Sequence, residues 1–221
     1  MRCNKSPLLL IGQMLLLSFL LAACGPTEIT VKQQGEAKEY VAPVVKVATT
    51  TKPLDIEKAK SDYKKALDAV QLGDYDLAET LFITMTEEYP TLPGPYLNLG
   101  LSYQRKEQFD AAEERFRQAI LVQPQNSIAY NQLGILLRTK GEFEASLKMY
   151  KKALDIDNDY ALAHLNIGIL LDLYLVKPAK ALAHYHTYQK LTDKKDQKVA
   201  FWIVDLEQRL QTEISQTGTG Y

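Results

Sequence analysis

The chain has 221 residues, of which 46% are hydrophobic and 24% are charged, proportions typical of a globular protein with one substantial domain. Its formal net charge is −1, and removal of the first 23 residues would leave 24 basic against 27 acidic side chains, which argues against a nucleic-acid partner because such partners usually require a basic surface. The two cysteines, Cys3 and Cys24, both lie in the N-terminal apolar segment, so no disulfide framework is expected.

Residues 1–23 have the pattern of a secretory signal peptide. Arg2 and Lys5 precede an apolar run from Leu8 to Leu21, which is short for a membrane span. The run ends in Leu-Ala-Ala-Cys at residues 21–24, which resembles the lipobox of bacterial lipoproteins. The resemblance implies cleavage before Cys24, lipidation of its thiol, and a membrane anchor made of several acyl chains, since one chain binds a bilayer only marginally. A soluble secreted protein with a chance cysteine at this place is the alternative.

The segment after the cysteine is expected to be a tether. Gly25 follows Cys24; in lipoproteins of this kind an aspartate there often retains the protein in the inner membrane, so its absence favours the outer membrane, facing the periplasm, if the bacterium is Gram-negative. Residues 24–54 mix Pro, Thr, Lys, Glu and Gln without a sustained helical period, which predicts a flexible linker. Its root-mean-square reach would be on the order of 30 Å.

A repeat of 34 residues dominates the rest of the chain, because Gly100, Gly134 and Gly168 stand 34 residues apart. Around each glycine, equivalent positions carry similar side chains: Tyr96, Leu99 and Tyr103; Tyr130, Leu133 and Leu137; His164, Ile167 and Leu171. A small, an aromatic and a small residue follow the first two glycines at Ala112, Phe116 and Ala119, and at Ser146, Tyr150 and Ala153. The agreement of flanks and spacing predicts one structural unit per period.

The same register continues on both sides. One period before Gly100 stands Ala66, and the later positions of that degenerate unit are Ala78, Phe82 and Met85. After Gly168, one extra residue in the turn is needed before Ala181, Tyr185 and Tyr188 resume the pattern. Pro178 is expected to begin the second helix of that unit, where its missing N–H costs nothing.

Over roughly residues 55–195 this pattern resembles the tetratricopeptide repeat (TPR) family. The resemblance implies an all-α fold in which each unit is two antiparallel helices that approach closely at the glycine and alanine positions. About four such units, near residues 59–92, 93–126, 127–160 and 161–195, would stack into a right-handed superhelix whose stability comes largely from contacts between neighbours.

A capping helix is expected over residues 196–214, where Val199, Trp202, Ile203, Leu206 and Leu210 lie at helical spacing on one stripe. Such a helix would hide the apolar edge of the last repeat. Trp202 is expected in the core, with contact to a partner as the alternative. The tail, residues 215–221, is expected to be disordered.

The resemblance also implies a partner-binding groove lined mainly by the first helix of each unit. Carried onto this register, the groove residues are Tyr63, Leu67, Leu97, Asn98, Leu101, Asn131, Ile135, Arg138, Leu165, Asn166 and Ile169. The TPR carboxylate clamp is doubtful here, because Leu97 and Leu165 stand where it needs cations or amides. A mostly apolar groove fits an amphipathic helix or an extended apolar peptide instead, with the asparagines on its backbone and Arg138 on one charge. The alternative for each leucine is packing against the next repeat.

Nothing in the sequence indicates an enzyme, a cofactor, a metal site or a small-molecule substrate. His184 and His186 would point about 200° apart on one helix, so they cannot share a metal ion. His164 occupies an aromatic packing position. There is no Gly-rich phosphate loop, no nucleophile elbow and no zinc-type spacing. Carboxylates such as Glu113 are expected on solvated helix surfaces among cations.

The sequence therefore predicts a lipid-anchored scaffold or adaptor that binds one or more proteins of a bacterial envelope complex. One alternative is a pilotin-like assembly factor for a type IV pilus or secretion complex, although that type generally has more repeats. Another is an adaptor for peptidoglycan enzymes or for a TonB-type energy-transducing complex. The residues do not choose between them, and they do not give the oligomeric state.

Overall fold

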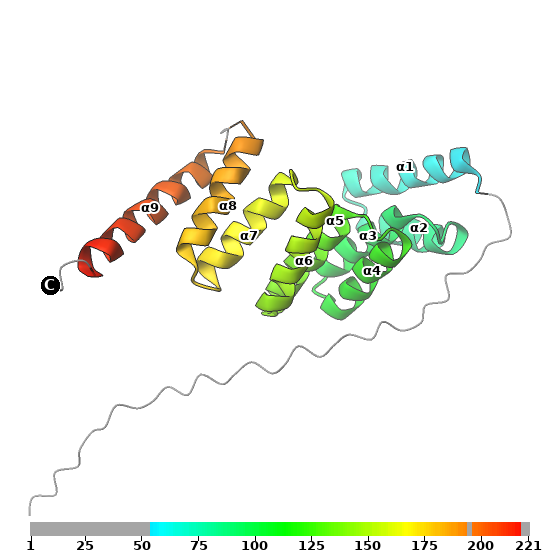
Figure 1. The fold of residues 1–221 in the computed structure, drawn as a ribbon. Coiled ribbons are helices and arrows are strands. Elements are labelled where there is room, and N and C mark those ends of the chain that lie inside the picture. The colour runs from blue at the N-terminus through cyan, green and yellow to red at the C-terminus, as the bar shows by residue number, and fades with distance from the viewer. Residues whose placement is uncertain (1–53, 194–195, 218–221) are drawn as a thin grey trace, which may run out of the picture. The chain divides into compact units, whose positions relative to one another are not determined.

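The computed structural model describes residues 54–193 and 196–217, and within these residues every regular element is an α-helix (Figure 1). The helices are α1 (Ile56–Leu72), α2 (Tyr75–Glu88), α3 (Pro93–Arg105), α4 (Phe109–Val122), α5 (Ser127–Thr139), α6 (Phe143–Ile156), α7 (Ala161–Leu173), α8 (Pro178–Leu191) and α9 (Gln197–Thr217). The all-α fold predicted from the 34-residue period is confirmed in this part of the chain. The expected signal peptide, the lipidation site Cys24, residues 24–53 of the tether and residues 218–221 of the tail lie outside it.

Consecutive helices pack as antiparallel pairs, α1 with α2, α3 with α4, α5 with α6 and α7 with α8. Side-chain caps start several of them: Asp55 accepts a hydrogen bond from Lys58 N, Asp74 from Leu77 N, and Asn126 from Ala129 N, which satisfies backbone donors that have no partner within the helix. Each pair then packs on the next one along the chain, so that the structure is a serial stack of repeats.

The glycines of the repeat are contact points between the two helices of a pair. A Cβ atom on Gly134 would lie 2.5 Å from Cε1 of Tyr150, and one on Gly168 would lie 2.5 Å from Cε1 of Tyr185. Both tyrosine rings are almost fully buried. Because interiors are close-packed, only glycine allows these rings to lie against the first helix, as the spacing predicted.

The C-terminal helix α9 packs on α8. Val199, Ile203 and Leu206 are buried in this contact, and the Trp202 ring lies 5.6 Å from the Tyr185 ring, centroid to centroid, which favours the packing interpretation of the tryptophan. The helix continues to Thr217, three residues past its expected end at 214. Within this extension the Ser215 hydroxyl donates to the carbonyl of Gln211 at 2.9 Å. In the part of the chain seen here, no helix is long and apolar enough to span a bilayer.

Candidate functional site

The first helices of the four pairs carry the predicted groove residues. Hydrogen bonds join α1 to α3 and α5 to α7, and helical spacing puts the groove residues of each helix on one side of that helix. We call the set Tyr63, Leu67, Leu97, Asn98, Leu101, Ile128, Asn131, Ile135, Arg138, Leu162, Leu165, Asn166 and Ile169 the A-helix face. It contains the eleven residues predicted from the sequence together with Ile128 and Leu162. These two stand at equivalent positions of α5 and α7, three residues before Asn131 and Leu165, so helical spacing puts them on the same side.

Tyr63 on α1 and Asn98 on α3 connect the first two repeats. The amide nitrogen Nδ2 of Asn98 donates to the Tyr63 hydroxyl at 2.8 Å and to the carbonyl of Gly94 at 3.0 Å. A Cβ atom on Gly94 would lie 3.0 Å from the Tyr63 hydroxyl, so the glycine leaves room for the ring. Burial raises the pKa of the Tyr63 hydroxyl above its ordinary value.

Asn131 on α5 and Asn166 on α7 connect the last two repeats. Nδ2 of Asn166 donates to Oδ1 of Asn131 at 3.0 Å, and the Arg138 guanidinium donates to Oδ1 of Asn166 at 3.5 Å. Asn131 is only 1% exposed. Asn131 and Asn166 are thus bonded to each other and join two repeats. Asn131 is not available to the backbone of a ligand, and the prediction that it contacts a partner is corrected.

The apolar members of the A-helix face divide into two groups. One group is half-buried and packs against the core clusters: Leu97, Ile135, Leu165 and Ile169. This agrees with the alternative interpretation, in which such side chains pack against the next repeat. Leu67, Leu101, Ile128 and Leu162 are between 38% and 49% exposed. Leu67 and Leu101 share one position of the repeat, and Ile128 and Leu162 share another. Exposed apolar side chains that gather on one face are typical of interaction surfaces. The sequence missed Ile128 and Leu162, although their equivalent positions in the repeat could have identified them.

An apolar pocket of about 300 Å³ lies where the N-terminal ends of α1 and α3 meet. Its wall is formed by Leu54, Ile56, Ala59, Lys60 and Tyr63 on one side and by Leu92, Pro93, Gly94 and Pro95 on the other. The pocket shares Tyr63 with the A-helix face and lies at its N-terminal end. It is large enough for one or two apolar side chains of a partner, and among the described residues of its wall the charge comes from Lys60.

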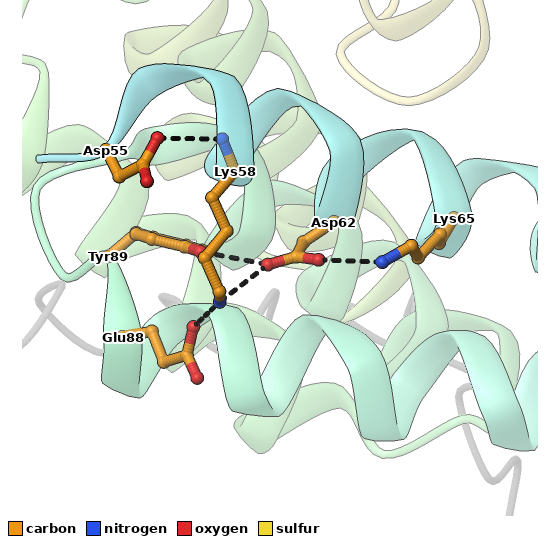
Figure 2. A network of polar contacts seen from close by, with 6 residues as sticks. All are labelled: Asp55, Lys58, Asp62, Lys65, Glu88 and Tyr89. Carbon is orange, nitrogen blue, oxygen red and sulfur yellow. Dashed lines mark hydrogen bonds and ion pairs between the residues drawn. The ribbon is translucent and has the colours of Figure 1, made fainter.

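A polar network joins α1 to the end of α2 (Figure 2). The Lys58 ammonium lies 2.6 Å from Glu88 Oε2 and 3.0 Å from Asp62 Oδ2, and it donates to the Tyr89 hydroxyl at 2.9 Å. The Tyr89 hydroxyl donates to Asp62 at 2.9 Å, and Lys65 lies 3.2 Å from the other Asp62 oxygen.

The hydrogen bonds of this network keep Asp62 ionised and Lys58 protonated. Hydrogen bonds from Lys58 and Tyr89 lower the pKa of Asp62 to about 2. The bond to Glu88, followed by those to Tyr89 and Asp62, raises the pKa of Lys58, so the amine stays protonated. A general base needs a pKa near the working pH, and the shifts of Asp62 and Lys58 move the pKa of both groups away from it. We therefore interpret the network as a clamp between α1 and α2.

The three histidines lie on α7 and α8. His184 faces His164 on α7, with their Nδ1 atoms 3.0 Å apart. His186 lies on the other side of α8, with Nε2 3.4 Å from Glu207 of α9. His184 and His186 therefore point in different directions, as their spacing on one helix predicted. No three His, Cys, Asp or Glu side chains converge on a possible metal position within residues 54–193 and 196–217. The contact between His164 and His184 was not visible in the sequence, because it depends on how α7 and α8 are rotated.

Comparison with protein families gives one match, the tetratricopeptide repeat, over residues 91–159. That range covers the second and third helix pairs. No curated protein sequence matches the chain.

Solved structures show the same fold. PilF of Pseudomonas aeruginosa superposes with a TM-score of 0.65 at 20% identity, covering 72% of this chain and 71% of PilF. A thermophilic TPR protein of Thermus thermophilus, TTC0263, gives a TM-score of 0.56 at 23% identity over 69% of this chain and 82% of its own. The Thermobaculum terrenum O-GlcNAc transferase gives 0.57 at 21% identity, but the match covers 63% of this chain and only 27% of the enzyme. At these identities the likeness establishes the fold alone.

Proposed function

We propose that this tetratricopeptide-repeat protein is a scaffold anchored by lipid in the bacterial envelope, and that it holds a partner protein on its A-helix face. The TPR fold is generally a non-catalytic scaffold for protein–protein interaction. The observation that carries the proposal is the set of four exposed aliphatic side chains on that face, Leu67, Leu101, Ile128 and Leu162.

The chemistry of the face determines the kind of partner. Its exposed side chains are aliphatic, and the amides of Asn98 and Asn166 are already hydrogen-bonded within the array. An apolar stripe with few free polar groups suits the apolar side of an amphipathic helix, or an extended apolar peptide. Full burial of one leucine or isoleucine is worth roughly 1.5–3 kcal/mol, and these four are already half covered. Together they could still supply several kcal/mol of binding free energy.

Charged substitutions on the exposed members test the proposal. Leu101→Asp and Ile128→Asp should reduce capture of the partner from detergent-solubilised envelope to background, while circular dichroism and the unfolding midpoint stay close to those of the wild type. Leu121→Asp is the matched control, because Leu121 is as exposed as Ile128 but lies on α4, a second helix. Equal capture by all variants, or equal loss in the control, would show that the partner binds elsewhere.

The membrane anchor is part of the proposal and rests on the sequence Leu-Ala-Ala-Cys at residues 21–24. Cys24 would carry the diacylglyceryl group, and Gly25 favours the outer membrane. A Cys24→Ser variant should lose metabolically incorporated palmitate and move from the membrane to the soluble fraction of the cell envelope. Cys3→Ser is the control and should leave labelling unchanged in the mature protein. Separation of inner from outer membranes then locates the wild type.

We further propose that the protein has no catalytic activity of its own and that its role is fixed by its partner. Crosslinking in intact cells followed by mass spectrometry identifies that partner. Recovery of pilus or secretion-channel subunits would indicate the pilotin-like role, and recovery of peptidoglycan enzymes or of a TonB-type complex would indicate the adaptor role. Purified protein that hydrolyses a substrate, with activity unaffected by partner removal, would contradict the scaffold proposal.

A further inference from the structure

His164 and His184 form a contact between two ionisable side chains, and neither residue belongs to the A-helix face. His164 lies on α7 and is 8% exposed, and His184 lies on α8. Their Nδ1 atoms are 3.0 Å apart, and their ring centroids are 5.2 Å apart with the planes tilted by 39°. The rings therefore meet through their nitrogens and do not stack. The other ring nitrogen of His164, Nε2, lies 3.1 Å from the backbone carbonyl oxygen of Asn158.

These contacts define where the protons are. A carbonyl oxygen can only accept, so Nε2 of His164 carries a hydrogen, and neutral His164 has an unprotonated Nδ1. That nitrogen accepts from Nδ1–H of His184, whose own Nε2 is then unprotonated when the ring is neutral. In this state both hydrogen bonds are satisfied and no charge is buried.

Protonation of both rings would destroy the contact. A first proton can be taken up at Nε2 of His184, and it leaves the bond between the Nδ1 atoms in place. A second proton must go to Nδ1 of His164, where two N–H groups and two positive charges would face each other at 3.0 Å. Burial, then repulsion from His164 and from Lys151 of α6, already lowers the pKa of His184 to about 4, so even the first proton is disfavoured while the helices are packed.

Among the described residues, the charged group that acts on the pair from a neighbouring helix is a cation, Lys151 of α6. In the turn between α6 and α7, Asp157 acts on Tyr160, and Asn158 contributes its carbonyl group. Glu207 of α9 is directed to His186. The neutral pair is thus the state that this environment stabilises.

We propose that the His164–His184 pair is an acid-sensitive latch, which holds the fourth helix pair closed at neutral pH and weakens it in mild acid. In the second and third repeats the position of His164 is occupied by Tyr96 and Tyr130, so the latch is confined to the last repeat. Separation of α7 from α8 would disturb the packing of α9 against α8. It would also move the residues that α7 contributes to the A-helix face. For this last consequence the inference rests on the proposed function: binding on that face would then depend on pH.

The sign of the effect follows from proton linkage. An unfolded histidine has a pKa near 6.5, above the value of about 4 for His184 in the folded chain. Between these two values the open state binds more protons than the closed state, so acid favours opening. The contribution of the latch is complete above about pH 6.5 and is lost as the pH falls toward 4.

Hydrogen exchange of the full-length chain in detergent, followed by mass spectrometry at pH 7.5 and pH 5.0, tests the latch. After correction for the intrinsic pH dependence of exchange, amides of α7 and α8 should lose protection by about thirtyfold at the lower pH, while those of α3 and α4 change little. In His184→Asn the loss should disappear, because the amide can donate to His164 or, after a flip, accept from it. His186→Asn is the matched control on the same helix and should behave as the wild type.

Two outcomes would overturn the proposal. One is an equal loss of protection in His184→Asn, and the other is a loss spread over all repeats. If His184→Asn does not fold, nitrogen NMR of the wild-type imidazoles decides: at pH 7.5 His164 should be the Nε2–H tautomer and His184 the Nδ1–H tautomer. The opposite assignment, or a His184 that titrates near 6.5, would also overturn it.

Discussion

At the scale of single residues, the turns inside the helix pairs show where the chain is strained. The first and third pairs have Gly73 and Gly141 at the turn, each with φ of 81°. Glu107 holds the same place in the second pair with φ of 58°, and the longer turn of the fourth pair has Val176 at 49°. A left-handed backbone is accessible to glycine and costs other residues about 1–2 kcal/mol, most of all a β-branched one.

Val176→Gly should therefore stabilise the fourth repeat. The gain from removing the strain is partly offset by the greater freedom of glycine in the unfolded chain, which leaves about 1 kcal/mol. Val176 is 76% exposed, so its side chain contributes little packing. Urea unfolding measures the change, and Gly141→Ala should shift the midpoint in the opposite direction. A lower midpoint for Val176→Gly would mean that the valine side chain makes a contact that outweighs the strain.

Gly134→Ala tests the contact between helix and ring at the same scale. The added methyl group would meet the Tyr150 ring at 2.5 Å, and overpacking of a rigid core costs about 1–3 kcal/mol. The cost should be much smaller in a Tyr150→Ala background, because the ring is then absent. A double-mutant cycle by thermal unfolding checks this, and additive effects would show that the glycine acts through backbone freedom instead.

Residue pairs also mark the limit of what the sequence could predict. The period predicted the small positions, since Gly134 and Gly168 repeat in register with the rings they contact. It could not predict that Asn166 bonds to Asn131 or that His184 bonds to His164. Such bonds depend on how neighbouring helices are rotated and offset against each other. A shift of one helix by one residue would bring different side chains together.

At the scale of elements, α1 differs from the other first helices in how it is held. At the position where the later repeats have Tyr96 or Tyr130, α1 has Asp62, which takes part in the clamp with Lys58, Glu88 and Tyr89. The degenerate first repeat thus replaces part of an apolar contact by charged hydrogen bonds, which are stronger than neutral ones. These bonds fix the position of Tyr63, the neighbour of Asp62, at the edge of the pocket.

Lys58→Met should loosen α1 from α2 and leave the other pairs unchanged. Removal of the ammonium leaves Glu88 without its cation and leaves Asp62 paired with Lys65 alone. Because Lys58 lies at the surface, the effect is modest, and amide exchange in α1 should accelerate about twofold to threefold. Lys60→Met is the matched control, because Lys60 pairs with Glu57 on the exposed side of the same helix. If both variants exchange alike, the clamp does not hold α1.

Acid should weaken the same clamp, because protonation of Asp62 removes its negative charge. The pKa of Asp62 is lowered to about 2, below its unfolded value near 3.9, so its stabilising effect is present at neutral pH and is lost as the pH falls through that interval. Carboxyl NMR of the wild type should show Asp62 titrating well below the ordinary pKa of an aspartate. In Lys58→Met its pKa should rise toward the ordinary value, and an unchanged pKa would show that Tyr89 and not Lys58 sets it.

At the scale of the whole molecule, the array is closed at its C-terminal edge by α9. Its apolar stripe was predictable, because a single helix signals its buried side by spacing alone, although the helix ends three residues later than expected. The number of helix pairs was predictable for the same reason, since each 34-residue unit carries its own pattern. The repeat register could have pointed to Ile128 and Leu162 as members of the A-helix face, but how far their side chains remain exposed depends on the packing of the neighbouring unit.

Truncation before Gln197 should destabilise the last pair without unfolding the middle of the array. Three buried aliphatic residues, Val199, Ile203 and Leu206, would be lost, each worth roughly 1.5–3 kcal/mol. In a linear array the loss is felt mainly by the adjacent repeat, so denaturant unfolding should become biphasic. A chain ending at Leu210 is the control, since it keeps all three contacts. A single transition shifted as a whole would show that the array unfolds as one unit.

The residues that hold the helix pairs together are not the residues exposed on the A-helix face. This separation has a consequence for engineering. Gly134 and Tyr150 lie inside a pair, whereas Leu101 and Ile128 are exposed on the first helices. Mutations at the exposed positions can accumulate, by selection or by design, without touching the contacts on which folding depends. A library randomised at Leu67, Leu101, Ile128 and Leu162 should therefore yield soluble variants with new specificities at high frequency.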